Sequence, residues 1–237
     1  MMIELLILLL AAAAAAILGG GLGALERVHP QWMQTELRHA IIAFGGGALF
    51  SAVALVLVPK GMAQQPSWTA LLSFALGAIV FMSCDRYFTN KGTPLSQLLA
   101  MLLDFVPEAI VVGAVITSNY SEAVFLTVVI AAQNFPEAFN AYREITHAGK
   151  GGFMRKHGLL VITIAALSGV GWGLFGLFAF EADSASLGTL MTFCAGGIVY
   201  LIFRDVAPQA TLERHWYPSL GAVAGFMVGM AGHAVVG

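Results

Sequence analysis

Apolar stretches of membrane-spanning length, separated by short polar connections, make up almost all of this chain. A helix needs about 20 mostly apolar residues to cross the hydrocarbon core of a bilayer. Eight segments meet that requirement, at about residues 3–24, 39–58, 67–84, 96–117, 121–142, 158–180, 187–206 and 216–236. Lipid offers no hydrogen-bond partner to exposed backbone, so such segments must be helical. We therefore predict an all-α polytopic membrane protein, with residues 1–237 forming a single transmembrane domain.

The composition excludes an ordinary soluble domain. Charged residues make up 10% of the 237 residues and hydrophobic ones 59%, and the mean hydropathy is +0.84. Soluble domains carry about 25% charged residues. Glu4 stands where a signal peptide would have a basic residue, so we expect the first segment to be a retained helix. Cys84 and Cys194 lie in apolar surroundings and predict buried thiols, and we expect no nucleic-acid partner.

The basic residues predict the orientation of the chain. Eleven lysines and arginines are present, and ten of them fall on the odd-numbered side of an eight-helix count: Arg27, Arg38, Arg86, Lys91, Arg143, Lys150, Arg155, Lys156, Arg204 and Arg214. Lys60 falls on the other side. Cytoplasmic connections carry an excess of basic residues. We therefore expect a multi-pass protein of the cell (inner or plasma) membrane with both termini outside the cytoplasm.

Two short motifs repeat each other in the middle of the chain. Residues Asp104 to Ala109 and Gln133 to Ala138 both place a polar residue, then Pro, then Glu within an apolar stretch. Carboxylates inside a membrane usually mark an ion or substrate pathway. Proline removes one backbone N–H, which frees the carbonyls of Leu103 and Ala132. The motifs predict two broken helices, each with a Glu at the break, as in the cation sites of secondary transporters.

A longer repeat relates the second and seventh segments. Both contain Phe, a Gly cluster and Pro at matching offsets, over residues Phe44 to Pro59 and Phe193 to Pro208. These two segments cross the membrane in opposite directions. The pattern is typical of the inverted repeats of secondary transporters and predicts three helices, a central pair and three further helices.

The side chains of the central pair predict a cation site. Residues four apart share a helix face, so Asp104 lies with Glu108 and Gln133 lies with Glu137. If those faces oppose each other, a divalent cation would relieve the repulsion among the carboxylates. All of these ligands offer oxygen, which suits Mg²⁺, Mn²⁺ and Ca²⁺ better than Zn²⁺. The candidate metal ligands are Asp104, Glu108, Gln133, Asn134 and Glu137, with Asn140 at the border.

Other interpretations of these polar residues remain open at this point. Glu108 and Glu137 could be protonated and hydrogen-bonded to the freed carbonyls, or could relay protons without a metal. Asp205 is either an interface charge, paired for example with Arg204, or a residue that guides cations outward from the central site. The histidines favour solvated interface positions, with His147 and His157 as a weak alternative exit site.

The paired Pro-Glu motifs resemble those of the ZIP (Zrt/Irt-like) family of divalent metal transporters, in its bacterial branch. In that family helix 4 carries His-Asn-x-Pro-Glu-Gly, and helix 5 carries a similar motif that begins with His or Gln. The resemblance extends over nearly the whole chain. It implies a ZIP-like bundle of eight helices, movement of metal toward the cytoplasm by an elevator or rocking motion, and a homodimer. It also implies zinc as the substrate, whereas the ligand chemistry allows Mn or Fe.

This chain departs from the family pattern at several positions. Asp104 and Phe105 replace the helix 4 histidine and asparagine, and Val56 replaces the carboxylate of helix 2. The run Ser168 to Gly173 lacks the acid found in helix 6 of many members. These departures imply one metal site rather than two.

Two further classes of function were weighed against transport. A diverged relative could carry another substrate or sense metal without transporting it. An intramembrane enzyme would need a motif such as His-Glu-x-x-His or Gly-x-Ser-x-Gly, and the sequence contains neither. We therefore expect no enzyme and no cofactor, with the metal ion as substrate.

Overall fold

A computed structural model describes residues 1–25, 36–90, 96–148, 152–181, 183–212 and 216–236. Every regular element within these ranges is a helix. Their bounds are Met2–Leu25 (α1), Arg38–Ala52 (α2), Val53–Leu57 (η3), Val58–Ala63 (α3), Ser67–Asn90 (α4), Ser96–Val115 (α5), Tyr120–Ala148 (α6), Gly152–Ala179 (α7), Ala185–Leu201 (α8), Ile202–Val206 (η4), Ala207–Ala210 (α9) and Tyr217–Val236 (α10). Because α2, η3 and α3 are continuous, as are α8, η4 and α9, the described residues form eight long helices, and the predicted all-α fold is confirmed.

Five of these helices are long and apolar enough to cross a membrane, within the part of the chain that the structure describes. They cover Met2–Leu25, Arg38–Ala63, Ser67–Tyr87, Lys156–Ala179 and Ala185–Ala210. The chain is thus a multi-pass membrane protein. The helices α5, α6 and α10 complete the set of eight, and α5 and α6 carry the polar motifs.

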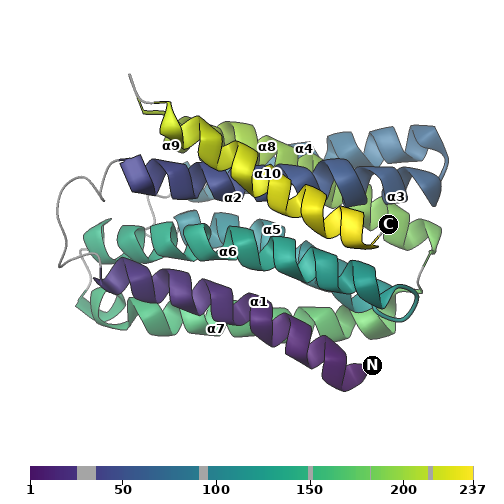
Figure 1. Ribbon diagram of the computed structural model, residues 1–237, viewed down its shortest axis with the longest axis horizontal. Coiled ribbons are helices and arrows are strands. Elements are labelled where there is room, and N and C mark those ends of the chain that lie inside the picture. The colour runs from purple at the N-terminus through teal and green to yellow at the C-terminus, as the bar shows by residue number, and fades with distance from the viewer. Residues whose placement is uncertain (26–35, 91–95, 149–151, 182, 213–215, 237) are drawn as a thin grey trace.

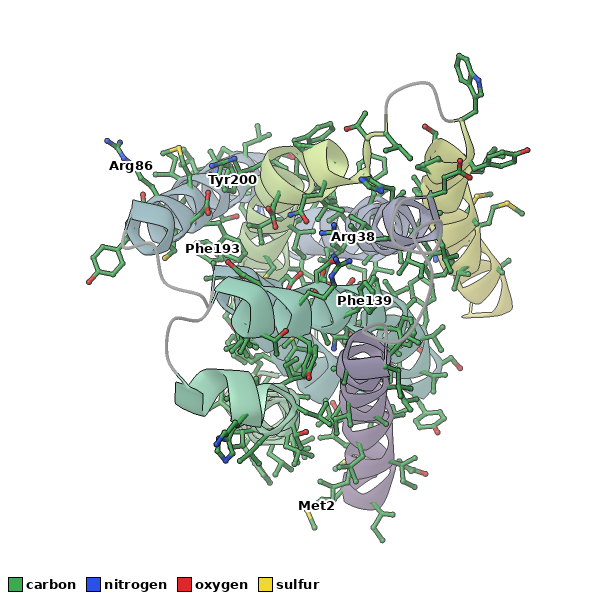
Figure 2. The ribbon with its side chains drawn as sticks, turned by 90° about the vertical axis from the view of Figure 1, so that its left-hand side faces the viewer. Met2, Arg38, Arg86, Phe139, Phe193 and Tyr200 are labelled. Carbon is green, nitrogen blue, oxygen red and sulfur yellow. The ribbon has the colours of Figure 1, made fainter. Side chains whose placement is uncertain are left out.

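Both chain termini lie at the same end of the helical bundle, as Figure 1 shows. We call this end the terminal end. The opposite end carries Arg38 and Arg86, and Figure 2 looks directly onto it. We call this opposite end the basic end. The separation of the basic residues from the termini agrees with the charge pattern on which the predicted orientation depends.

The helices pack as two groups that meet in the middle of the molecule. The first body consists of α1, α5, α6 and α7, and its closest pairs are α1 with α6 and α5 with α7. The second body consists of the continuous helices α2–α3 and α8–α9 together with α4 and α10. Contacts between the bodies are made chiefly by α6 with α2 and α10 and by α5 with α8. In Figure 1, α5 and α6 lie between the remaining helices of the two bodies.

Glycine brings α4 and α8 into backbone contact. A Cβ added at Gly77 would overlap the backbone carbonyl of Phe193, and one added at Gly196 would overlap that of Phe74. Small residues permit such close approach of helices in lipid, where packing replaces the hydrophobic effect as the main source of association. The pair α4–α8 therefore forms a tightly packed part of the second body.

The two segments that repeat each other in sequence share an unusual local structure. Each contains one turn of π-helix, η3 in the first and η4 in the second, at matching offsets from the Phe and the Gly cluster. Each π turn is followed directly by a short α-helix with proline in its first turn, Pro59 in α3 and Pro208 in α9. A π turn adds a residue to the helical repeat and often occurs at functional sites.

The prolines of the two motifs do not break their helices, so that prediction was wrong. The helix α5 continues through Pro107, and α6 continues through Pro136. Each proline removes only one backbone hydrogen bond, and neighbouring helices support the rest of the turn. Pro136 packs against Gly45 of α2, where a Cβ would come within 2.7 Å of the proline Cγ.

A second correction concerns the predicted end of the second apolar segment at about residue 58, which would place Pro59, Lys60 and Gly61 in a connection. These residues lie within α3, and the chain turns only after Ala63. Pro59 directly follows the π turn η3 within this continuous helix, where the regular α-helical hydrogen-bond pattern is already interrupted. Lys60 is consequently held on a helix, which determines where its ammonium group lies.

Candidate cation site

The predicted ligands are held inside the molecule by the central helices. Asp104 and Glu108 lie on α5, and both are buried. Gln133 and Asn134 lie on α6 and are also buried, whereas Glu137 is partly exposed. The spacing of four residues places Asp104 with Glu108 and Gln133 with Glu137 on the facing surfaces of the two helices, as the sequence predicted.

The polar side chains of these faces meet as two pairs. The Gln133 Nε2 donates a hydrogen bond to the Glu108 Oε2. Asp104 and Glu137 share a side-chain hydrogen bond, and the Phe105 backbone N–H donates to the Asp104 Oδ1 at 2.7 Å. A hydrogen bond between two carboxyl groups requires that one of them holds a proton. We refer to Asp104, Glu108, Gln133 and Glu137 as the central site.

The sequence predicted that all the candidate ligands converge on one cation. In the structure the residues of the central site meet as two separate pairs. Among the described residues, no three Asp, Glu, His or Cys side chains converge on one point at metal-binding distance. Asn134 is buried, with both polar atoms of its amide unpartnered. It belongs to neither pair, so its role as a ligand stays a prediction.

Several oxygen atoms of the central site have no hydrogen-bond donor. They are the Glu108 Oε1, the Gln133 Oε1 and the Glu137 Oε2, and the nearby Asn140 Oδ1 shares this property. Buried polar atoms are nearly always satisfied in folded proteins. These atoms are all oxygens that accept hydrogen bonds, and they lie in buried surroundings. Oxygen atoms of this kind are the ligands that a hard divalent cation requires.

A small cavity of about 30 Å³ lies beside half of the central site. Asp104 and Glu137 line it, together with Asn140 and Asp205. Asp205 Oδ1 accepts a hydrogen bond of 2.7 Å from the Nε2 of Gln209, which also lines the cavity. Glu108 and Gln133 do not line this cavity.

The position of Asp205 bears on one alternative left open by the sequence. Its neighbour Arg204 pairs with Asp85 of α4, with 3.4 Å between Nε and Oδ2. The hydroxyl of Tyr200 donates to the same Oδ2 at 2.8 Å. Asp205 shares the cavity with Asp104 and Glu137. Asp205 therefore lies beside the central site, and its role in guiding cations stays a prediction.

Phe105 stands at the position of asparagine in the ZIP motif that this segment resembles. Its side chain is fully buried and points at α7, where a Cβ on Gly169 would overlap the phenyl ring. The ring therefore fills the space between α5 and the Gly-rich run of α7. An apolar ring thus occupies this position in place of a polar side chain.

The predicted histidine positions are only partly described. His29 and His215, like the side chain of His147, lie outside the described residues, so the proposed exit site formed with His157 is not described. Among the basic residues, Arg27, Lys91, Lys150 and Arg214 and the side chain of Arg155 also lie outside them. His233 is exposed, and its ring lies 6.1 Å from that of Phe125, centroid to centroid.

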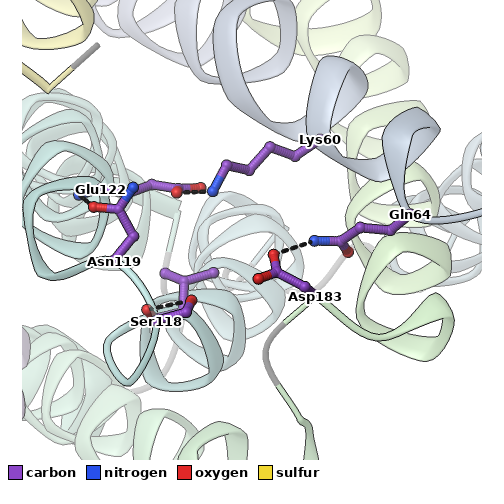
Figure 3. Close-up of polar contacts among 7 residues, drawn as sticks. Lys60, Gln64, Ser118, Asn119, Glu122 and Asp183 are labelled. Atoms are coloured by element: carbon purple, nitrogen blue, oxygen red, sulfur yellow. Dashed lines mark hydrogen bonds and ion pairs between the residues drawn. The ribbon is translucent and has the colours of Figure 1, made fainter.

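The sequence analysis missed an ion pair near the terminal end. The ammonium group of Lys60 on α3 pairs with the Oε2 of Glu122 on α6, as Figure 3 shows. The Glu122 side chain is only 3% exposed, whereas that of Lys60 is 34% exposed. The signal was available, since Lys60 is the one basic residue on its side of the predicted membrane and Glu122 opens an apolar helix.

No protein-family model matches this chain, and no curated protein matches it.

Proposed function

We propose that this protein is a ZIP-like secondary transporter that moves a divalent metal ion across the membrane. The observation that carries the proposal is the set of buried carboxyl and amide oxygens at the central site, where the two bodies meet. Zinc is the substrate that the resemblance favours, and the oxygen ligands extend the choice to Mn²⁺ or Fe²⁺.

A bound cation would resolve the electrostatic difficulty of the central site. Three carboxyl groups lie close enough to interact, and none of the hydrogen bonds given above brings a lysine or arginine to them. A divalent ion would use the unpartnered oxygens of Glu108, Gln133 and Glu137. Its binding would displace the proton shared by Asp104 and Glu137, because metal ligands bind in their deprotonated form.

The arrangement of the helices supports transport by alternating access. The central site belongs to the first body, and its cavity is completed by residues of the second body, including Asp205. Matching π turns in η3 and η4 support an inverted repeat, although they involve only the second body. Movement of the first body against the second would carry the site between the two ends. We place the basic end in the cytoplasm, the termini outside, and the direction of transport toward the cytoplasm, in a homodimer.

The packing of Phe105 on Gly169 favours a second candidate function. It removes a position at which the related family has a metal ligand. A diverged protein that senses metal, or that carries another substrate, would retain the central site without catalysing metal flux. Binding without uptake would identify this function.

Uptake by proteoliposomes tests the proposal. Purified protein would be reconstituted, and the initial uptake of Zn²⁺, Mn²⁺, Fe²⁺ and Ca²⁺ would be measured for the native protein and for Glu108→Ala and Glu137→Ala. We expect saturable uptake of at least one ion and its loss in both variants. Glu181→Ala, at an exposed position near the terminal end, is the matched control and should retain native rates. Native rates in Glu137→Ala would contradict the proposal.

A further inference from the structure

The ion pair between Lys60 and Glu122 joins the two bodies near the terminal end. Lys60 belongs to the second body and Glu122 to the first. In the same region, the Nε2 of Gln64 donates to the Oδ1 of Asp183 at 3.1 Å (Figure 3). The Oδ1 of Asn119 accepts from the backbone N–H of Glu122 at 3.1 Å, which caps the first turn of α6. Glu122 is therefore held rigidly at the helix start.

Only one of the two carboxylate oxygens of Glu122 is paired. Its Oε2 contacts the Lys60 ammonium group, whereas its Oε1 is buried and has no hydrogen-bond partner. A buried acceptor without a donor is destabilising, and a bound water or ion is one of the arrangements that satisfies such an atom in a folded protein. The carboxylate thus has capacity for a second positively charged partner.

A cavity of about 320 Å³ lies beside Glu122. Glu122, Lys60 and Asn119 line it, and so does His233 from α10. The volume is sufficient for a cation with part of its hydration shell, since a water molecule occupies about 30 Å³ in the liquid. A carboxylate, an amide oxygen and an imidazole together form a ligand set for a divalent transition metal.

We infer that Glu122 is an entry site for a divalent cation at the terminal end, and that the ammonium group of Lys60 occupies this site as a tethered competitor. The inference rests on the proposed function in that it places the entry of the substrate at this end. An arriving cation binds the Glu122 Oε1, which has no hydrogen-bond partner, and is also coordinated by the imidazole of His233. It displaces the Lys60 ammonium group from Oε2. Because Lys60 and Glu122 belong to different bodies, this exchange also releases one of the contacts that hold the bodies together.

Lysine is suited to this role. Its ammonium group is a compact monovalent charge on a flexible stem, and the side chain of Lys60 is partly exposed, so it can withdraw into water when displaced. Removing one partner of a buried ion pair is costly when the other charge remains uncompensated. Exchange of Lys60 for a metal ion avoids that cost, because Glu122 always has a cationic partner.

Binding of Mn²⁺ to the purified protein tests the inference. The number of bound ions would be measured by equilibrium dialysis for the native protein, Lys60→Met and Lys60→Arg. At Mn²⁺ concentrations too low for the ion to displace Lys60 in the native protein, we expect Lys60→Met to bind up to about one further equivalent, because the competitor is gone. Lys60→Arg keeps the pair and should bind none in addition. The additional Mn²⁺ bound by Lys60→Met should persist when Glu108→Ala and Glu137→Ala are introduced into that variant to remove the central site. It should vanish when Glu122→Gln is introduced into Lys60→Met.

The outcomes separate this inference from the proposed function. No additional equivalent in folded Lys60→Met, with Mn²⁺ still bound at the central site, would overturn the entry site and leave the transporter in place. An additional equivalent that depends on Glu122, with no binding at the central site and no uptake, would support the entry site and contradict the transporter.

A second variant covers the case in which Lys60→Met does not fold. In otherwise native protein, Glu122→Gln should raise the Mn²⁺ concentration for half-maximal uptake about tenfold and leave the maximal rate unchanged, because entry rather than translocation is affected. An unchanged half-saturation value would overturn the inference. His233→Ala should shift the same value in the same direction.

Discussion

At the level of single residues, the proposed cation site depends on the side chain at position 104. Asp104 offers oxygen where the ZIP motif that it resembles has an imidazole nitrogen, and its hydrogen bond to Glu137 holds the two carboxyl groups together. Phe105 packs on Gly169 and acts as part of the core. We therefore expect substitution to be tolerated better at Asp104, which lines a cavity, than at Phe105, which is packed in the core.

Asp104→His should shift the ion preference toward zinc. Imidazole is a better ligand for Zn²⁺ than for Mn²⁺, so we expect the ratio of zinc to manganese uptake to rise about tenfold. Competition between the two ions in proteoliposomes measures this ratio. Phe105 should be kept, because truncating a buried Phe costs about 3–5 kcal/mol. Glu181→His, an exposed substitution of the same type, should leave the ratio unchanged; an equal change in both variants would contradict a role for Asp104 in selectivity.

At the level of helices, close packing and buried hydroxyl groups hold the second body together. Besides the glycine contacts, the hydroxyls of Ser73 on α4 and Thr192 on α8 are hydrogen-bonded. The Gln65 Nε2 donates to the Thr192 Oγ1 at 3.0 Å, and the Thr189 Oγ1 donates to the Gln65 Oε1 at 2.9 Å. These contacts give α4 and α8 a fixed relative position, which a rigid body requires.

Gly196→Ala should destabilise the protein. The new methyl group would overlap the backbone of α4 at Phe74, and a forced shift of this kind costs about 1–3 kcal/mol. The midpoint of thermal unfolding in detergent should therefore fall. Gly171→Ala on α7 is the matched control, because no atom lies within 4 Å of the added Cβ, and it should be neutral or slightly stabilising. Similar midpoints for the two variants would show that the α4–α8 contact is not tight.

At the level of the whole molecule, the division into two bodies determines which contacts would change in the proposed transport cycle. Gly45 of α2 meets Pro136 of α6 across the boundary, whereas Gly46 meets Val206 of η4 within the second body. Adjacent residues of one helix thus face different bodies. The Gly45–Pro136 contact should therefore change if the bodies move, whereas the Gly46–Val206 contact should not.

A disulfide across the boundary should stop transport. A Cβ at Gly45 would lie 3.6 Å from the Cβ of Pro136, and a Cβ at Gly46 would lie 3.8 Å from that of Val206. Both distances suit a disulfide. With Cys84 and Cys194 replaced by Ala, oxidised Gly45→Cys/Pro136→Cys should lose uptake and regain it after reduction. Oxidised Gly46→Cys/Val206→Cys should remain active. Full activity of the oxidised first pair would exclude relative movement of the bodies.

The sequence alone determined the helices and the polar residues they carry. Hydrocarbon forces the backbone to satisfy its hydrogen bonds within each segment, so apolar length predicts the helices without knowledge of their neighbours. The spacing of four residues likewise placed Asp104 with Glu108 and Gln133 with Glu137 on shared faces. Whether those residues bind metal stays a prediction. The effect of Pro107 and Pro136 was overestimated, because support from adjacent helices cannot be inferred from a single helix.

Only the tertiary structure decided how these helices are grouped and which side chains meet. The pairing of Lys60 with Glu122, the place of Asp205 beside Asp104, and the packing of Phe105 all join residues distant in the sequence. Such contacts depend on how each helix is rotated and how closely it approaches its neighbours. In a membrane those quantities are set by packing of small residues and by interhelical hydrogen bonds, because apolar side chains are equally compatible with lipid on every face.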